Sequence, residues 1–124
     1  MRVLLVDDSR VMRNIEKKSL EGLGASSFDE AGDGVEALAL ISSSAPFNLI
    51  LVDWNMPNMD GFTLVTKIRE KDKVTPLIMV TTEAEKQRVI DAIKAGVNNY
   101  VIKPFTAEAL LEKVRQTLTK AKAA

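Results

Sequence analysis

Short apolar runs alternate along this chain with longer segments in which apolar residues are spaced as in a helix. One such segment carries Phe62, Val65 and Ile68, and the last carries Leu110, Val114 and Leu118. Spacing of three or four positions predicts amphipathic helices with one buried face. The short runs are too far apart for hairpins and predict five strands: Arg2 to Val6, Ser27 to Ala31, Leu49 to Val52, Leu77 to Thr81 and Asn99 to Ile102.

Residues at the ends of the predicted helices agree with this pattern. Ser9 and Thr106 stand where side chains could cap helix starts, and Gly24 and Gly96 stand where two helices should stop. Residues 120–124 are predicted to be a helical tail that frays.

The alternation of strands and helices predicts an α/β fold, a doubly wound five-stranded parallel sheet with five helices. Right-handed crossovers would cover both faces of the sheet, so its central strands should be almost wholly apolar. The first, third and fourth runs fit the centre, whereas the half-polar run Ser27 to Ala31 fits an edge.

The composition is that of a single globular domain spanning residues 1–124, with 46% hydrophobic and 27% charged residues. Lysine plus arginine equals aspartate plus glutamate, 17 each, so no global field favours nucleic acid or a membrane surface. The first apolar run meets two aspartates at once and is no signal peptide, so we expect a cytoplasmic protein. Cysteine and histidine are both absent, which leaves carboxylates, lysines and hydroxyls for any chemistry.

Polar residues follow four of the five predicted strands. In a doubly wound sheet, ligands bind outside the carboxyl ends of the strands, so these side chains should share one edge. Each residue alone is more often a solvated strand end, but their coincidence favours a site. They are Asp7 and Asp8, Asp53, Thr81 and Thr82, and Lys103.

Three clustered carboxylates repel one another unless a cation is present, and hard oxygen ligands suit Mg²⁺. Three negative charges then balance Mg²⁺ and the ammonium group of Lys103. Such a site could accept phosphate, because the cations neutralise a transferring phosphoryl group and an ionised aspartate can attack it in line. Thr81 would offer a hydroxyl donor, and the product would be an acyl phosphate.

Five separated motifs resemble the receiver domains of bacterial two-component signalling, in the same order and with similar spacing. The resemblance spans nearly the whole chain and implies a flavodoxin-like fold with strand order 2-1-3-4-5. The motifs are Leu-Val-Asp-Asp at 5–8, Leu-Val-Asp-Trp-Asn-Met-Pro at 51–57, Met-Asp-Gly at 59–61, Val-Thr-Thr at 80–82 and Tyr-Val-Ile-Lys-Pro at 100–104.

The resemblance also implies a role for each matching residue. Asp53 would be the phosphoacceptor, and Asp8, Asp53 and the backbone carbonyl of Asn55 would bind Mg²⁺. Asp7 would hold a metal-bound water molecule, and Lys103 would contact the phosphoryl group. The protein would not be an enzyme in the ordinary sense, because it would assist only its own phosphorylation and dephosphorylation.

In receivers, a threonine and an aromatic residue form a switch, which here would be Thr81 and Tyr100. The Thr81 hydroxyl would move toward a new phosphoryl group, and Tyr100 would then turn inward. The Lys103–Pro104 bond should be cis by the same resemblance. Thr82 departs from the small residue usual there, and it and Asn55 are the remaining expected phosphoryl contacts.

The implied partners are a histidine kinase, or a small phosphodonor, and a target protein. The Asp-Trp-Asn-Met-Pro run, the segment Thr81 to Ala84, Tyr100 and the lack of an output domain resemble the single-domain regulators of chemotaxis. The target would then be the flagellar motor switch, which would bind the face formed by the fourth helix, fifth strand and fifth helix. We expect a monomer, and leave open both a dedicated phosphatase and a phosphorelay outside chemotaxis.

Two other functions deserve comparison. A phosphatase of the haloacid dehalogenase type also uses a strand-end aspartate, but needs a second aspartate where this chain has Asn55. A nucleotide-binding module is suggested by Gly-Asp-Gly-Val-Glu-Ala at 32–37, which fits a loose dinucleotide-binding pattern. Against it, Asp33 would face the pyrophosphate and the preceding strand is a polar edge.

A third alternative is an interaction domain of the same fold that is not phosphorylated. Such a relative should lack Asp7, Asp8, Asp53 or Lys103, all of which are present.

Overall fold

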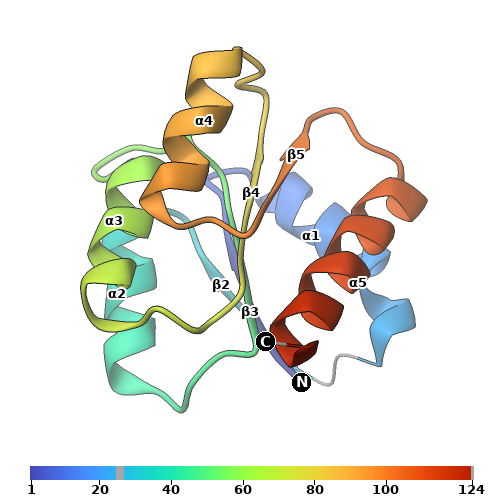
Figure 1. The fold of residues 1–124 in the computed structure, drawn as a ribbon. Coiled ribbons are helices and arrows are strands. Elements are labelled where there is room, and N and C mark those ends of the chain that lie inside the picture. The colour runs from blue at the N-terminus through green and yellow to red at the C-terminus, as the bar shows by residue number, and fades with distance from the viewer. Residues whose placement is uncertain (25–26, 124) are drawn as a thin grey trace.

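A computed structural model describes residues 1–24 and 27–123 and has the predicted α/β architecture (Figure 1). The five parallel strands lie in the order β2-β1-β3-β4-β5, as predicted. Their bounds are those of the apolar runs: β1 Arg2–Val6, β2 Ser27–Ala31, β3 Leu49–Val52, β4 Leu77–Thr81 and β5 Asn99–Ile102.

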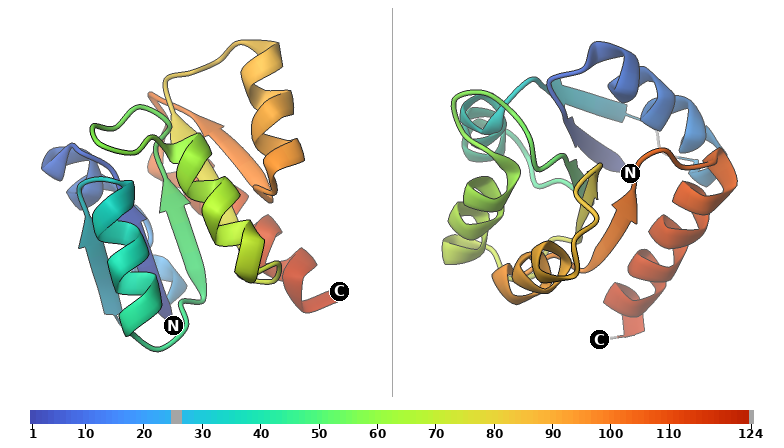
Figure 2. Two further views of the ribbon diagram at one scale, coloured as in Figure 1. Left: turned by 90° about the vertical axis from the view of Figure 1, so that its left-hand side faces the viewer. Right: turned by 90° about the horizontal axis from the view of Figure 1, so that it is seen from above.

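Five α-helices cover the two faces of the sheet (Figures 1 and 2). The helices α2, α3 and α4 lie on one face, and α1 and α5 lie on the other. No helix in the described part of the chain is long and apolar enough to cross a membrane. The helices are α1 Arg10–Ser19, α2 Gly34–Ser43, α3 Gly61–Lys71, α4 Lys86–Ala95 and α5 Ala107–Ala123.

The sheet separates two apolar layers. Leu4, Ile50 and Met79 point toward the layer under α2, α3 and α4, and Leu5 and Leu51 point toward the layer under α1 and α5. Adjacent residues of a strand face opposite sides, so a central strand must be apolar at every position. All residues of β3 and β4 are buried, whereas β2 is only partly buried at the edge.

The helix ends mostly follow the predicted signals. Ser9 accepts a hydrogen bond from the amide of Met12, Thr106 accepts one from the amide of Ala109, and α4 ends at Gly96 with φ of 120°. Gly24 does not end α1, which already stops at Ser19; it ends a 3₁₀ turn over Glu21–Leu23. The predicted fraying tail lies in α5 up to Ala123, and residue 124 is outside the described part.

Candidate phosphoryl-acceptor site

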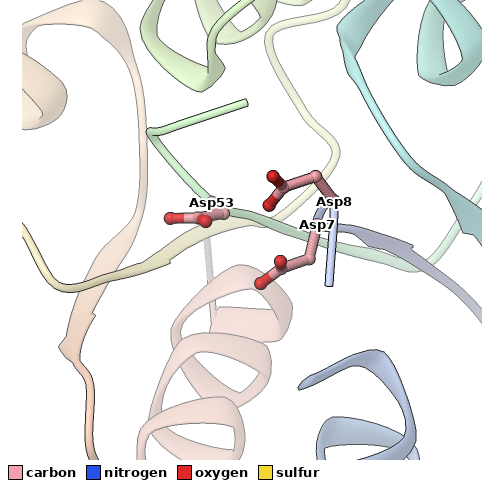
Figure 3. Close-up of side chains that lie close together, drawn as sticks. All are labelled: Asp7, Asp8 and Asp53. Atoms are coloured by element: carbon pink, nitrogen blue, oxygen red, sulfur yellow. The ribbon is translucent and has the colours of Figure 1, made fainter. Parts of the chain in front are cut away.

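The three predicted carboxylates lie together at the carboxyl edge of the sheet (Figure 3). Asp7 and Asp8 directly follow β1, and Asp53 directly follows β3, the neighbouring strand. Sheet-like bonds continue past the strand ends, from the Asp7 amide to the Ala31 carbonyl and from the Asp53 amide to the Val6 carbonyl. One oxygen from each carboxylate lies within 4.8 Å of the others. Asp7 and Asp53 are buried and Asp8 is exposed, so the cluster opens to solvent on one side.

Lys103 brings a positive charge to the same cluster from the end of β5. Its Nζ lies 2.7 Å from Asp7 Oδ2 and 3.4 Å from Asp53 Oδ2. The Lys103 amide donates to the Thr81 carbonyl, and the bond between Lys103 and Pro104 is cis, as predicted. Strands at both sides of β3 therefore contribute to one site.

Burial sets the electrostatics of the phosphoacceptor candidate. It raises the pKa of Asp53, and the charge of Asp7 adds to this rise. The Thr81 hydroxyl and the Lys103 ammonium act in the opposite direction, because both favour the ionised carboxylate. For Lys103, burial alone would lower the pKa, but the hydrogen bond with Asp7 and the charge of Asp53 raise it overall. Lys103 is therefore held as a cation beside Asp53.

The donor set fits a divalent metal ion. Three carboxylates with one ammonium group leave an excess of negative charge, and only Asp8 among the carboxylates is well exposed to water. Oxygen ligands of this kind are those that Mg²⁺ prefers. Asp8 and Asp53 would hold the ion, and Asp7 would orient its water. The backbone carbonyl of Asn55 remains a predicted ligand.

Thr81, Thr82 and Asn55 reach the same edge with different degrees of burial. Thr81 ends β4 and is fully buried, and its hydroxyl accepts a hydrogen bond of 3.3 Å from the Glu83 amide. Thr82 and Asn55 are exposed. The Asn55 side-chain amide donates to Glu83 Oε1 at 3.2 Å. Contact of Thr82 and Asn55 with a phosphoryl group stays a prediction.

Tyr100 already occupies the inward position that was expected to follow phosphorylation. The residue is 8% exposed, and its hydroxyl donates to the backbone carbonyl of Glu83 at 2.6 Å. Burial raises the pKa of Tyr100 to about 12, the Glu83 charge adds to this, and Arg88 opposes it. The carbonyl satisfies a phenol that would otherwise be buried without a partner.

Comparisons with known proteins agree with this geometry. Residues 3–115 match the response regulator receiver domain family. The chain belongs to this family. Two similar curated proteins are the chemotaxis protein CheY homolog of Campylobacter jejuni and CheY1 of Helicobacter pylori. Each is 48% identical over 120 residues, which is 95% of this chain and 92% and 97% of those proteins, respectively.

Two solved receiver structures are similar over nearly their full length. A CheY-like receiver domain protein from Methanospirillum hungatei has a TM-score of 0.89 at 32% identity, covering 98% of this chain and 96% of that one. The chemotaxis response regulator CheY4 of Vibrio cholerae has a TM-score of 0.84 at 36% identity, covering 94% and 97%. The predicted resemblance to receivers of the single-domain chemotaxis type is confirmed.

The dinucleotide-like motif at 32–37 has a structural role in this receiver. Asp33 caps α2, since its Oδ1 accepts the Glu36 amide at 2.9 Å. Its Oδ2 accepts the side-chain amide of Asn58 at 2.7 Å, and Asn58 has a φ of 66°. Asp33 therefore ties the start of α2 to the loop that follows Asp53.

The structural roles of two residues near the site were not predicted from the sequence, although Gly61 is part of the motif at 59–61. Gly61 opens α3 so close to the site that a Cβ there would lie 2.0 Å from the Asp53 carbonyl oxygen. Glu16 of α1 is buried, and its Oε1 has no hydrogen-bond partner among the described residues. Its place four residues before the buried Leu20 is the signal that puts it on the inner face of α1.

Proposed function

We propose that this receiver is a phosphorylation-activated switch whose acceptor is the carboxylate of Asp53. The observation that carries the proposal is the convergence of Asp7, Asp8, Asp53 and Lys103 on one edge of the sheet. Two buried carboxylates that share a single ammonium group would be a poor choice for a purely structural role, because burial of the uncompensated charge costs free energy. A phosphoryl-transfer site explains the burial, the acidic cluster and the lysine together.

In the transfer, an Asp53 oxygen attacks the phosphorus atom of the donor, and the bond from phosphorus to the donor's nitrogen or oxygen breaks. The leaving group keeps the electron pair of that bond. Lys103 moves its ammonium group from the Asp53 carboxylate to the phosphoryl oxygens, a short shift because Nζ already lies 3.4 Å from Oδ2. Mg²⁺, when bound, neutralises negative charge on the transferring group.

We propose that the donor is a separate histidine kinase or a small phosphodonor, since the chain has no histidine of its own. The target would bind the face formed by α4, β5 and α5, next to Tyr100. The relatives named as chemotaxis proteins support a role in chemotaxis. The flagellar motor switch is the target that we propose for such a role. The protein would act in the cytoplasm as a monomer.

Trp54 offers a direct test, because it follows Asp53 and is the only tryptophan. Trp54 is 5% exposed, and its ring stacks on that of Phe62, with centroids 5.4 Å apart. Addition of Mg²⁺ should change its fluorescence, and acetyl phosphate should then cause a further change that slowly reverses. Asp53→Asn protein should lose the second change. A second change of equal size in Asp53→Asn protein would contradict phosphorylation at Asp53.

A further inference from the structure

The segment between β4 and α4 is held from two sides through Glu83. The Glu83 carbonyl accepts the Tyr100 hydroxyl from β5, and its Oε1 accepts the Asn55 amide from the loop after β3. A third contact joins the first turn of α4 to the loop after β3. The Arg88 guanidinium carbon of α4 lies 4.9 Å from the centroid of the Trp54 ring.

The first turn of α4 is weak by its own sequence. Its N-cap residue, Glu85, makes no side-chain hydrogen bond to the helix, whereas Asp60 caps α3. The turn contains no acidic residue, and it carries the cations Lys86 and Arg88. Positive charge at a helix start opposes the macrodipole, and a missing cap leaves amides unsatisfied. This turn therefore depends on contacts with the rest of the protein.

Trp54 gives Arg88 a fixed surface to bind. The ring is buried and stacked on Phe62, and the Trp54 carbonyl accepts the amide of Gly61 at 2.8 Å. Arg88 forms no ion pair within the described residues, so its charge is directed at the ring face. A cation over tryptophan is the strongest contact of this kind. Arg88 also lies near enough to Tyr100 to oppose the rise of its pKa, which burial chiefly causes.

We propose that Arg88 is a positioning residue of the switch. Its contact with Trp54 holds the first turn of α4 against the loop that follows Asp53, and so keeps the Glu83 carbonyl where Tyr100 binds it. Movement of that loop would then pass to α4 and to the target face. The link to phosphorylation rests on the proposed function, but the contact itself can be tested in the unmodified protein.

The test compares two variants. Arg88→Met retains an unbranched side chain but removes the positive charge, and Arg88→Lys retains the positive charge. The Val89 amide bonds to the Glu85 carbonyl in the first turn of α4, so its hydrogen exchange reports on that turn. Because Arg88→Met also removes a charge that opposes the helix macrodipole, it is compared with Lys86→Met, which removes another cation of the first turn. Exchange should be about two- to fivefold faster in Arg88→Met than in Lys86→Met, the range expected for an exposed cation–π contact. Arg88→Lys should lie closer to the wild type. Lys94→Met removes a cation from the last turn of α4 and should leave this amide unchanged.

A second readout separates positioning from mere helix stability. Tyr100 is the only tyrosine, so fluorotyrosine labelling gives a single ¹⁹F resonance from the switch residue. In Arg88→Met the resonance should shift toward that of a solvent-exposed tyrosine, and Arg88→Lys should restore it. Faster Val89 exchange with an unchanged Tyr100 resonance would overturn the positioning role, as would no change in either.

Intact mass after acetyl phosphate treatment distinguishes failure of the proposed function from failure of this inference. If wild-type protein takes up no phosphoryl group, the function of Asp53 is wrong while the two measurements above still decide the role of Arg88. If phosphorylation of the wild type changes both the Trp54 fluorescence and the Tyr100 ¹⁹F resonance, Arg88→Met should reduce the change of the Tyr100 resonance. An undiminished Tyr100 response in that variant would overturn the coupling.

Discussion

Single residues in this receiver are constrained most tightly where two backbone segments approach. Gly61 is the clearest case, because its missing side chain leaves room for the peptide of Asp53. At the same time, the Gly61 amide donates to the Trp54 carbonyl. The start of α3 is thereby packed directly against the backbone of Asp53. Gly61, which has no side chain, thus helps to fix the backbone position of Asp53.

Gly61→Ala should disturb the site and the fold together. The new Cβ would meet the Asp53 carbonyl oxygen at 2.0 Å, and backbone atoms cannot turn aside as a flexible side chain can. We expect a loss of about 3 kcal/mol in the free energy of unfolding, measured by urea denaturation, and a weaker response of Trp54 to Mg²⁺. Gly22→Ala is the matched control, since its Cβ would meet only Leu111 Cδ2 at 3.9 Å. Equal stability of the two variants would refute this explanation.

The elements differ in how well their own sequences specify them. Each of the helices α1, α2 and α3 has an N-cap side chain that accepts a hydrogen bond from a backbone amide of the first turn. These N-cap residues are Ser9, Asp33 and Asp60, respectively. Helix α4 has no such cap, and its first turn faces the switch region. Local preferences that conflict with the observed structure are often found at functional sites. The weak start of α4 is therefore consistent with the proposal that this element responds to phosphorylation of Asp53.

Removal of a cap should be measurable at α3. Asp60 Oδ1 accepts the Thr63 amide at 2.8 Å, so Asp60→Ala should lower the free energy of unfolding by about 1 kcal/mol. Asp60→Ser should recover most of this loss, because serine is also a good N-cap residue. Urea denaturation of the three proteins tests the prediction. A serine variant no more stable than the alanine variant would show that the cap is not responsible.

The stability of the folded protein should depend on pH through the buried carboxyl group of Glu16. Burial, with the charge of Asp7 next in size, raises the pKa of Glu16 from 4.5 to about 8. Between these values the folded protein keeps a proton that the unfolded chain has released. This contribution to stability is therefore present at low pH and is lost as pH rises from about 4.5 toward about 8. Each pH unit in this window corresponds to about 1.4 kcal/mol at most.

Glu16→Gln should remove this dependence. The amide has the same shape but no charge to bury, so the variant should gain stability relative to wild type as pH rises toward about 8. Denaturation midpoints at several pH values measure the effect. Glu21→Gln, at an exposed position, is the control and should run parallel to the wild type. Parallel curves for Glu16→Gln as well would mean that Glu16 does not hold a proton in the folded state.

Much of this molecule could be predicted because its signals are local or follow from topology. The apolar runs gave the strand bounds, and the parallel arrangement brought Asp7, Asp8, Asp53 and Lys103 to one edge. Contacts between distant segments could not be predicted in the same way. The contact of Arg88 with Trp54 depends on side-chain packing, which has no signature in spacing. Spacing puts Glu16 on the inner face of α1, but it does not predict that its Oε1 has no hydrogen-bond partner among the described residues. Gly24 fits a helix stop equally well at the end of α1 or of a 3₁₀ turn.

We propose that Asp53 accepts a phosphoryl group in a reaction that depends on Mg²⁺. Intact mass spectrometry of wild-type and Asp53→Asn protein, each treated with acetyl phosphate with and without Mg²⁺, tests it most directly. We predict one added phosphoryl group in the wild type with Mg²⁺, and none in Asp53→Asn protein or in the wild type after chelation of the metal. The same added mass in Asp53→Asn protein, or none in the wild type with Mg²⁺, would contradict the account.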